Sequence, residues 1–167
     1  MMPDRQAAAA LALLFALGAG DAAAGSPLTP AGIAAEIDAH GADAVVALLS
    51  KTNDYDRVLG HIDTGDVAWV ALAPKLAPGT DAGTAEALPI ALAFALPRNA
   101  PAVLAVLDPG SSILGPESVC GVPFIEGTVK DIPGYVRRAK AAVAKVSDPK
   151  LQASKTACLA ALGQPLP

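Results

Sequence analysis

Apolar residues recur every three or four positions along most of this chain, which is the period of one face of an α-helix. The clearest stripe consists of Tyr55, Val58, Leu59 and Ile62. The stretch 66–107 continues as three helices joined by turns of roughly three to five residues, short enough to make neighbouring helices antiparallel. The pattern predicts an all-α fold of six or seven short antiparallel helices, arranged as a HEAT-like array of helical hairpins or as an orthogonal bundle.

Capping residues mark the expected helix boundaries. A side-chain oxygen before an apolar periodic run accepts the first unpaired backbone N–H groups of a helix, and a glycine after the run ends it. The expected N-caps are Thr29, Asn53, Asp66, Asp81, Asn99, Asp131 and Asp148, and the expected helix ends include Gly41, Gly65 and Gly163.

The helix expected from Asp81 carries Ala85, Leu88, Leu92 and Leu96 on one face. Pro89 falls inside it and removes one helical hydrogen bond. Either the helix kinks at Pro89 or it consists of two pieces, and the kink is the favoured interpretation.

The N-terminal stretch has the three parts of a secretory signal peptide. Arg5 precedes an apolar run over 7–17, and Ala22–Ala24 provide a small-residue cleavage pattern before Gly25. The run is shorter than the roughly 20 residues that span a bilayer. We therefore expect residues 1–24 to be a leader and 25–167 to form one helical domain, without a transmembrane segment after cleavage, in the periplasm or secreted.

Composition indicates a core made of small and aliphatic side chains. Hydrophobic residues make up 53% of the chain but aromatic residues only 4%, which suits close-packed helices better than a β-sandwich. Trp69 is the only tryptophan, and its apolar neighbours at helical spacing favour a core position over an exposed recognition role. Cys120 and Cys158 are the only cysteines, and in an oxidising compartment we expect them to form a disulfide rather than two buried thiols.

Charge is unevenly distributed along the chain. Residues 25–126 contain four basic and twelve acidic side chains, whereas residues 127–167 contain seven basic and two acidic ones. Such asymmetry marks a binding face, or it means that basic C-terminal helices pack across acidic ones in the same molecule. The internal packing is the favoured alternative.

Residues 111–128 form the one long segment without helical periodicity, rich in Gly, Pro and Ser but also containing apolar residues. Irregular segments of this length are functional or fixed in place, and fixing through Cys120 is the favoured interpretation. Glu117 and Glu126 lie within this segment and offer a pair of carboxylates, the arrangement that glycoside hydrolysis uses.

The sequence lacks the residue patterns of the common metal, nucleotide and serine-hydrolase sites. The chain has only two histidines, His40 and His61, and no sequence pattern of a zinc, calcium, phosphate-loop, dinucleotide or serine-hydrolase site. We therefore expect no enzyme, no cofactor and no metal. The net charge of −4 and the expected export disfavour nucleic acid as a partner.

Several runs resemble a group of small exported proteobacterial proteins of unassigned function. They are WVALAPKLAPGTDA over Trp69–Ala82, Ala95-Leu96, VCGVPFIE over Val119–Glu126, and Cys158-Leu159. The resemblance covers most of the chain after residue 24, implies an exported helical domain, and carries over no catalytic residue.

These observations favour a binding module whose partner is another protein, for example an inhibitor of a secreted toxin of the immunity-protein kind. Its expected interaction residues are Arg137, Arg138 and Lys140 of the basic helix and Glu117 and Glu126 of the 111–128 segment. Two alternatives remain open. One is an envelope hydrolase that uses Glu117 or Glu126, and the other is a structural envelope protein that contacts anionic surfaces through Arg137, Arg138, Lys140 and Lys145.

Overall fold

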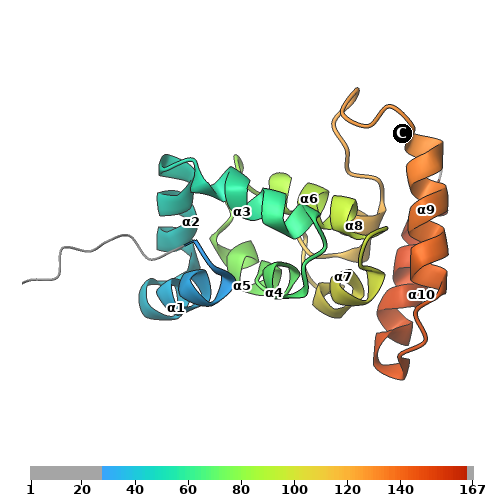
Figure 1. Cartoon of the computed structure of the whole chain (residues 1–167), viewed down its shortest axis with the longest axis horizontal. Coiled ribbons are helices and arrows are strands. Elements are labelled where there is room, and N and C mark those ends of the chain that lie inside the picture. The colour runs from blue at the N-terminus through green and yellow to red at the C-terminus, as the bar shows by residue number, and fades with distance from the viewer. Residues whose placement is uncertain (1–27, 165–167) are drawn as a thin grey trace, which may run out of the picture.

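The computed structural model describes residues 28–164, and the expected leader lies outside them. Within this part the regular elements are α-helices and 3-10 turns, without a strand, so the predicted all-α fold is confirmed. The helices follow one another along the long axis, from α1 and α2 at one end to α9 and α10 at the other (Figure 1). The elements are α1 (Pro30–His40), α2 (Ala42–Lys51), α3 (Asp54–Asp63), α4 (Val67–Val70), α5 (Ala73–Leu76), η1 (Ala77–Gly79), α6 (Ala87–Ala95), α7 (Ala100–Val106), α8 (Pro116–Cys120), α9 (Ile132–Ala144), η2 (Pro149–Leu151) and α10 (Gln152–Ala161).

Most of the predicted caps form as expected. The side chains of Thr29, Asp66, Asn99 and Asp131 each accept a backbone N–H from two or three residues further along. Asn53 precedes α3 in the left-handed conformation and makes no side-chain capping bond. The predicted helix boundaries are therefore set by local hydrogen bonding at most ends.

Gly65 is required at the corner between α3 and α4. Its φ is 78°, a conformation that side chains with a Cβ rarely adopt, and a Cβ placed there would lie 3.1 Å from the Cβ of Asn99. The Asn99 side-chain amide donates to the Gly65 carbonyl at 2.8 Å. This contact fixes the start of α7 against the end of α3.

The helix expected after Asp66 is divided at Pro74. Pro74 lacks the N–H that would bond to the Val70 carbonyl, so this helix separates into α4 and α5.

The helix expected from Asp81 begins later than predicted. Asp81 caps a turn, accepting from the N–H groups of Gly83 and Thr84, and α6 begins only at Ala87. Pro89 therefore lies in the first helical turn, where a missing N–H leaves no helical bond unmade, and the kink predicted at Pro89 is wrong.

Helix α6 is the centre of the core. It is apolar around its circumference, with Leu88, Leu92 and Leu96 fully buried in a cluster that extends from Ile33 to Leu162. It packs against α3, α7 and α8. A helix that is apolar on all sides is stable only when neighbours cover every face, so α6 organises the helices around it.

Trp69 lies at the edge of this core rather than inside it. The side chain is half-buried, and its ring stacks on the exposed His61 with centroids 4.4 Å apart and an interplanar angle of 11°. Trp69 packs against the core but is only partly buried, so the core position predicted for it is only partly correct.

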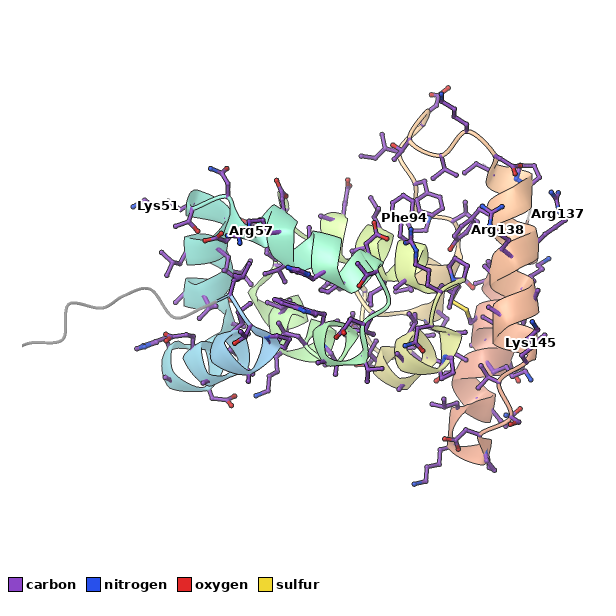
Figure 2. The ribbon with its side chains drawn as sticks, viewed as in Figure 1. Lys51, Arg57, Phe94, Arg137, Arg138 and Lys145 are labelled. Carbon is purple, nitrogen blue, oxygen red and sulfur yellow. A yellow bond between two sulfur atoms is a disulfide. The ribbon has the colours of Figure 1, made fainter. Side chains whose placement is uncertain are left out.

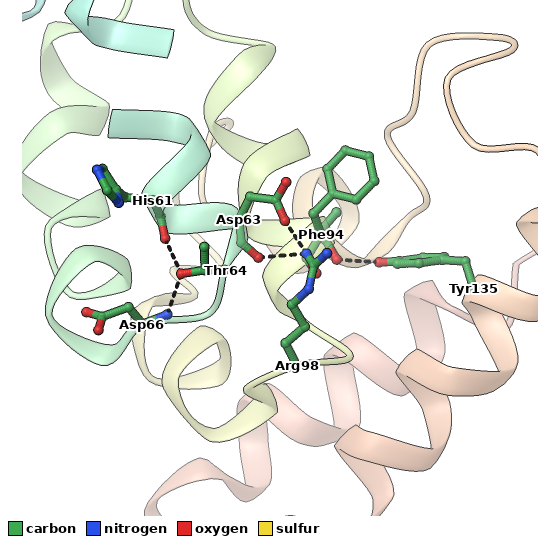
Figure 3. Close-up of polar contacts among 8 residues, drawn as sticks. His61, Asp63, Thr64, Asp66, Phe94, Arg98 and Tyr135 are labelled. Carbon is green, nitrogen blue, oxygen red and sulfur yellow. Dashed lines mark hydrogen bonds and ion pairs between the residues drawn. The ribbon is translucent and has the colours of Figure 1, made fainter. Parts of the chain in front are cut away.

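Polar contacts join the C-terminal ends of α3 and α6 (Figure 3). The guanidinium of Arg98 donates to the backbone carbonyls of Asp63 and Phe94 at 2.8 and 3.0 Å and pairs with the Asp63 carboxylate. These bonds supply partners for carbonyls at two helix ends, which have none within their own helices.

The predicted disulfide is confirmed. Cys120 at the end of α8 and Cys158 in α10 are bonded at 2.07 Å, and both are fully buried. The bond crosslinks positions 38 residues apart and ties the last helix to the segment that precedes α9.

Tyr55 and Tyr135 are both buried, but they differ in the hydrogen bonding of their hydroxyl groups. Burial, with a smaller contribution from the Asp81 carboxylate, raises the pKa of Tyr55 to about 12, and burial also raises the pKa of Tyr135. The Tyr135 hydroxyl donates to the Ala93 carbonyl at 2.9 Å and so joins α9 to α6 (Figure 3). The Tyr55 hydroxyl makes no hydrogen bond within the described residues.

This contrast gives a matched pair of variants. Tyr135→Phe is expected to lower the free energy of unfolding by about 1 kcal/mol, because it removes a buried hydrogen bond. Tyr55→Phe is expected to leave that free energy unchanged or raise it, because it removes an unpaired buried hydroxyl. Urea unfolding of both variants checks the order, and a greater loss in Tyr55→Phe would contradict it.

Removal of the disulfide is expected to destabilise the fold. Closing a loop of this length reduces the entropy of the unfolded chain, so the double variant Cys120→Ala/Cys158→Ala should lose about 4 kcal/mol. Urea unfolding of the oxidised wild type and the variant measures this loss. The reduced wild type is the control, since it lacks the bond but retains both sulfur atoms, and equal stability of oxidised and reduced protein would refute the expectation.

Candidate interaction surface

Three of the predicted interaction residues, Arg137, Arg138 and Lys140, lie on α9, at one end of the molecule (Figure 1). This helix packs inward through Tyr135, Ala139 and Val143. Because its apolar residues are used in the core, α9 presents its basic residues on the remaining faces.

The outward face of α9 carries charges without internal partners. Arg137 and Arg138 are exposed, as is Lys145 just after the helix, whereas Lys140 is half-buried. Arg138 lies 3.9 Å from the Asp131 carboxylate, but Arg137, Lys140 and Lys145 form no ion pair with any residue of 28–164. Arg137 and Lys145 lie on the side of α9 that faces away from the other end of the molecule (Figure 2).

Lys155 has a structural role instead. Its Nζ donates to the carbonyls of Ala144 and Val146, at 2.7 Å each. A cation at this position satisfies carbonyls at the C-terminal end of α9 and interacts favourably with the helix dipole. Lys155 is therefore not available as a free charge of the surface.

Residues 121–131, called the 121–131 loop below, stand out beside the start of α9 (Figure 1). Phe124 turns inward, with its ring centroid 4.7 Å from both the Phe94 and Tyr135 rings. Ile125, the next residue, is 65% exposed. Within the loop, Phe124 therefore packs against the rest of the fold, whereas Ile125 is exposed to solvent.

Val122 adopts a strained backbone conformation within this loop. Its φ is 62°, in the left-handed region, which is a genuine outlier for a β-branched residue. The residue lies between two fixed points, the disulfide at Cys120 and the inserted ring of Phe124. These two points hold the loop in a conformation that Val122 alone would not favour.

The long irregular segment predicted over 111–128 is only partly correct. Helix α8 occupies Pro116–Cys120, and Ser111 Oγ organises the preceding turn by accepting the N–H groups of Ile113 and Leu114. The fixing expected from Cys120 is present, and the part without helix is the 121–131 loop.

Glu117 and Glu126 lie in different elements, and both are exposed. Glu117 lies in the first turn of α8, and Glu126 lies in the 121–131 loop. A groove of about 570 Å³ lies elsewhere, between Pro74–Pro78 and the segment 105–114, and neither glutamate lines it. The hydrolase alternative therefore gains no support from this groove.

The favoured interpretation of the charge asymmetry is not supported. Every ion pair of the described residues lies either within 28–126 or within 127–164, and none joins the two segments. The basic segment displays its charge at one end of the molecule rather than neutralising it against the acidic segment.

Residues 28–164 contain no group of three or more His, Cys, Asp or Glu side chains that could hold a metal ion. In the same residues no helix has the length and apolar character that crossing a membrane requires. Comparison with known proteins gives no match to a family model, to a curated protein or to a solved structure.

Sequence reasoning missed the exposure of Ile125 and the packing of Phe124 between Phe94 and Tyr135. Adjacent apolar residues in an aperiodic segment do not reveal which one points inward. The only available signal was the aromatic residue itself, since a large ring in a chain with few aromatics is expected to be buried.

The strained conformation of Val122 predicts that glycine is more stable than alanine at this position, the reverse of the usual order. At ordinary positions Gly is less stable than Ala by roughly 0.5–1 kcal/mol. At a left-handed position an L-residue costs about 1–2 kcal/mol, so Val122→Gly is expected to be more stable than Val122→Ala by about 1 kcal/mol. Both variants lose the two γ-methyl groups of Val122, and they differ only in the Cβ atom. Urea unfolding measures the stability of each variant. If Val122→Ala is the more stable, the position is unstrained.

Proposed function

We propose that this chain is an exported binding module without catalytic activity, and that it binds another protein through the 121–131 loop and the outward face of α9. The observations that carry the proposal are the exposed Ile125 in the 121–131 loop, which precedes α9, and the exposed Arg137 and Lys145, which form no ion pair with any residue of 28–164. The loop and α9 lie at the same end of the molecule (Figure 1).

The surface combines an exposed apolar side chain with an arginine. Arginine is enriched where proteins bind one another, and a few residues, arginines among them, carry most of the binding energy. Leu48, Val67 and Ile125 are the large apolar residues most exposed within 28–164. Of these three, Ile125 is the one in the loop that precedes α9, at the same end of the molecule (Figure 1).

The loop is also organised before binding. The disulfide, the inserted Phe124 and the strained Val122 restrict its conformations, so less conformational entropy is lost when it docks. A rigid helical domain with a preformed loop suits a protein that blocks the surface of another. Inhibition of a secreted toxin, of the immunity-protein kind, is the specific form that we propose.

Two features support export to the periplasm or the exterior. The leader pattern of residues 1–24 is that of a secretory signal, and a buried disulfide is typical of proteins from oxidising compartments. The alternative of a structural envelope protein depends on the same cations of α9.

Capture from an extract of exported proteins tests the proposal, with the oxidised chain from residue 25 as bait. Wild type is expected to retain one stoichiometric protein at moderate salt, and Ile125→Asp is expected to lose it, because a carboxylate cannot occupy an apolar contact. Leu48→Asp is the matched control, since Leu48 is 59% exposed on α2 at the opposite end.

Two results would refute the proposal. One is equal capture by Ile125→Asp and wild type, which would place binding on another surface. The other is the absence of any captured protein when circular dichroism shows that the bait is folded.

A further inference from the structure

We infer that copies of this chain associate head to tail, with the basic end of one copy, formed by α9 and α10, contacting the acidic helices α1–α3 of the next. The second copy is held by charge and covers the outward face of α9. The inference goes beyond the proposed function, because it concerns the purified chain in the absence of any other protein.

Opposite charges are gathered toward the two ends of the long axis. Residues 28–63, which form α1–α3, contain six acidic and two basic side chains, whereas residues 127–164, which include α9 and α10, contain seven basic and two acidic ones. Helices α1 and α2 lie at one end of the molecule and α9 and α10 at the other (Figure 1), and only Thr52 and Asn53 separate α3 from α2. The chain therefore carries an electric dipole along its long axis.

Part of the charge at each end has no partner within the molecule. Asp43 in α2 and Asp56 in α3 are exposed and form no ion pair with any residue of 28–164. The same holds for Arg137 and Lys145 at the basic end, which lie on the side of α9 that faces away from the acidic end (Figure 2). These side chains are available to contact a second molecule.

One arrangement of two copies brings opposite charges together. Two basic ends repel each other, as do two acidic ends, so a two-fold arrangement through either end is disfavoured. Contact of a basic end with an acidic end is attractive, and the attraction orients the two copies before they touch. Each such pair keeps one unused end of each kind, so further copies can add in the same way.

Sedimentation velocity of the purified, oxidised chain from residue 25 tests the inference. At about 0.01 M salt, where charges act over about 30 Å, the weight-average mass should rise with protein concentration. At about 1 M salt, where this length falls to about 3 Å, the chain should be a monomer. A monomer at every concentration under both conditions would overturn the inference. Association that persists at about 1 M salt would also overturn it, because it would be apolar.

Variants at each end identify the two contact regions. Arg137→Glu/Lys145→Glu and Asp43→Lys/Asp56→Lys each largely cancel the charge of one end, so each is expected to be monomeric alone at low salt. A mixture of the two should form pairs, because one variant keeps its acidic end and the other its basic end. Lys51→Glu is the matched control, since it removes a cation from the acidic end (Figure 2) and should strengthen association.

The acidic variant requires a check of folding. Asp43 and Asp56 lie in the first turns of α2 and α3, where a negative charge interacts favourably with the helix dipole, so their reversal lowers stability. Circular dichroism at the temperature of sedimentation shows whether the variant is folded. Asp43→Asn/Asp56→Asn is the milder second variant, and it should weaken association in the same direction.

The outcomes distinguish the inference from the proposed function. Association that Arg137→Glu/Lys145→Glu retains, or a mixture of the two variants that stays monomeric, would overturn the head-to-tail contact. Neither result affects the capture of another protein, which is measured in an extract at moderate salt and depends on Ile125. Equal capture by Ile125→Asp and wild type would overturn the proposed function while leaving the association of the purified chain intact.

Discussion

The requirement to cover α6 on every side determines how the other helices are placed. This helix has almost no polar face, so water must be excluded from its whole circumference. Helices α3, α7 and α8 provide most of the cover, and Tyr135 brings α9 against it through the Ala93 carbonyl. The end that carries the candidate surface is thereby connected directly to the centre of the core.

Fixed points on both sides place the 121–131 loop relative to α9. The disulfide holds the start of the loop to α10, and Phe124 packs between Phe94 of α6 and Tyr135 of α9. Lys155 closes the other end of α9. The exposed Ile125 and the cations of α9 therefore belong to one rigid unit, which is what a specific binding surface requires.

Features that depend on local chemistry were predictable from the sequence. Caps such as Asp66 and Asn99, the apolar stripe of α3 and the pairing of the two cysteines follow from hydrogen-bonding capacity, periodicity and cysteine count. The start of α6 was not predictable, because Asp81 caps a turn as readily as a helix. The inward turn of Phe124 and the left-handed Val122 depend on helices distant in sequence, so no local pattern contains them.

The disulfide also makes residues 120–158 a closed covalent ring that contains both the 121–131 loop and α9. Exposed loop tips are preferred sites of proteolytic cleavage. A single cut within this loop opens the ring but leaves both fragments joined through sulfur. A nicked molecule would keep its mass under non-reducing conditions, and α9 would remain attached to the core by the disulfide as well as by packing.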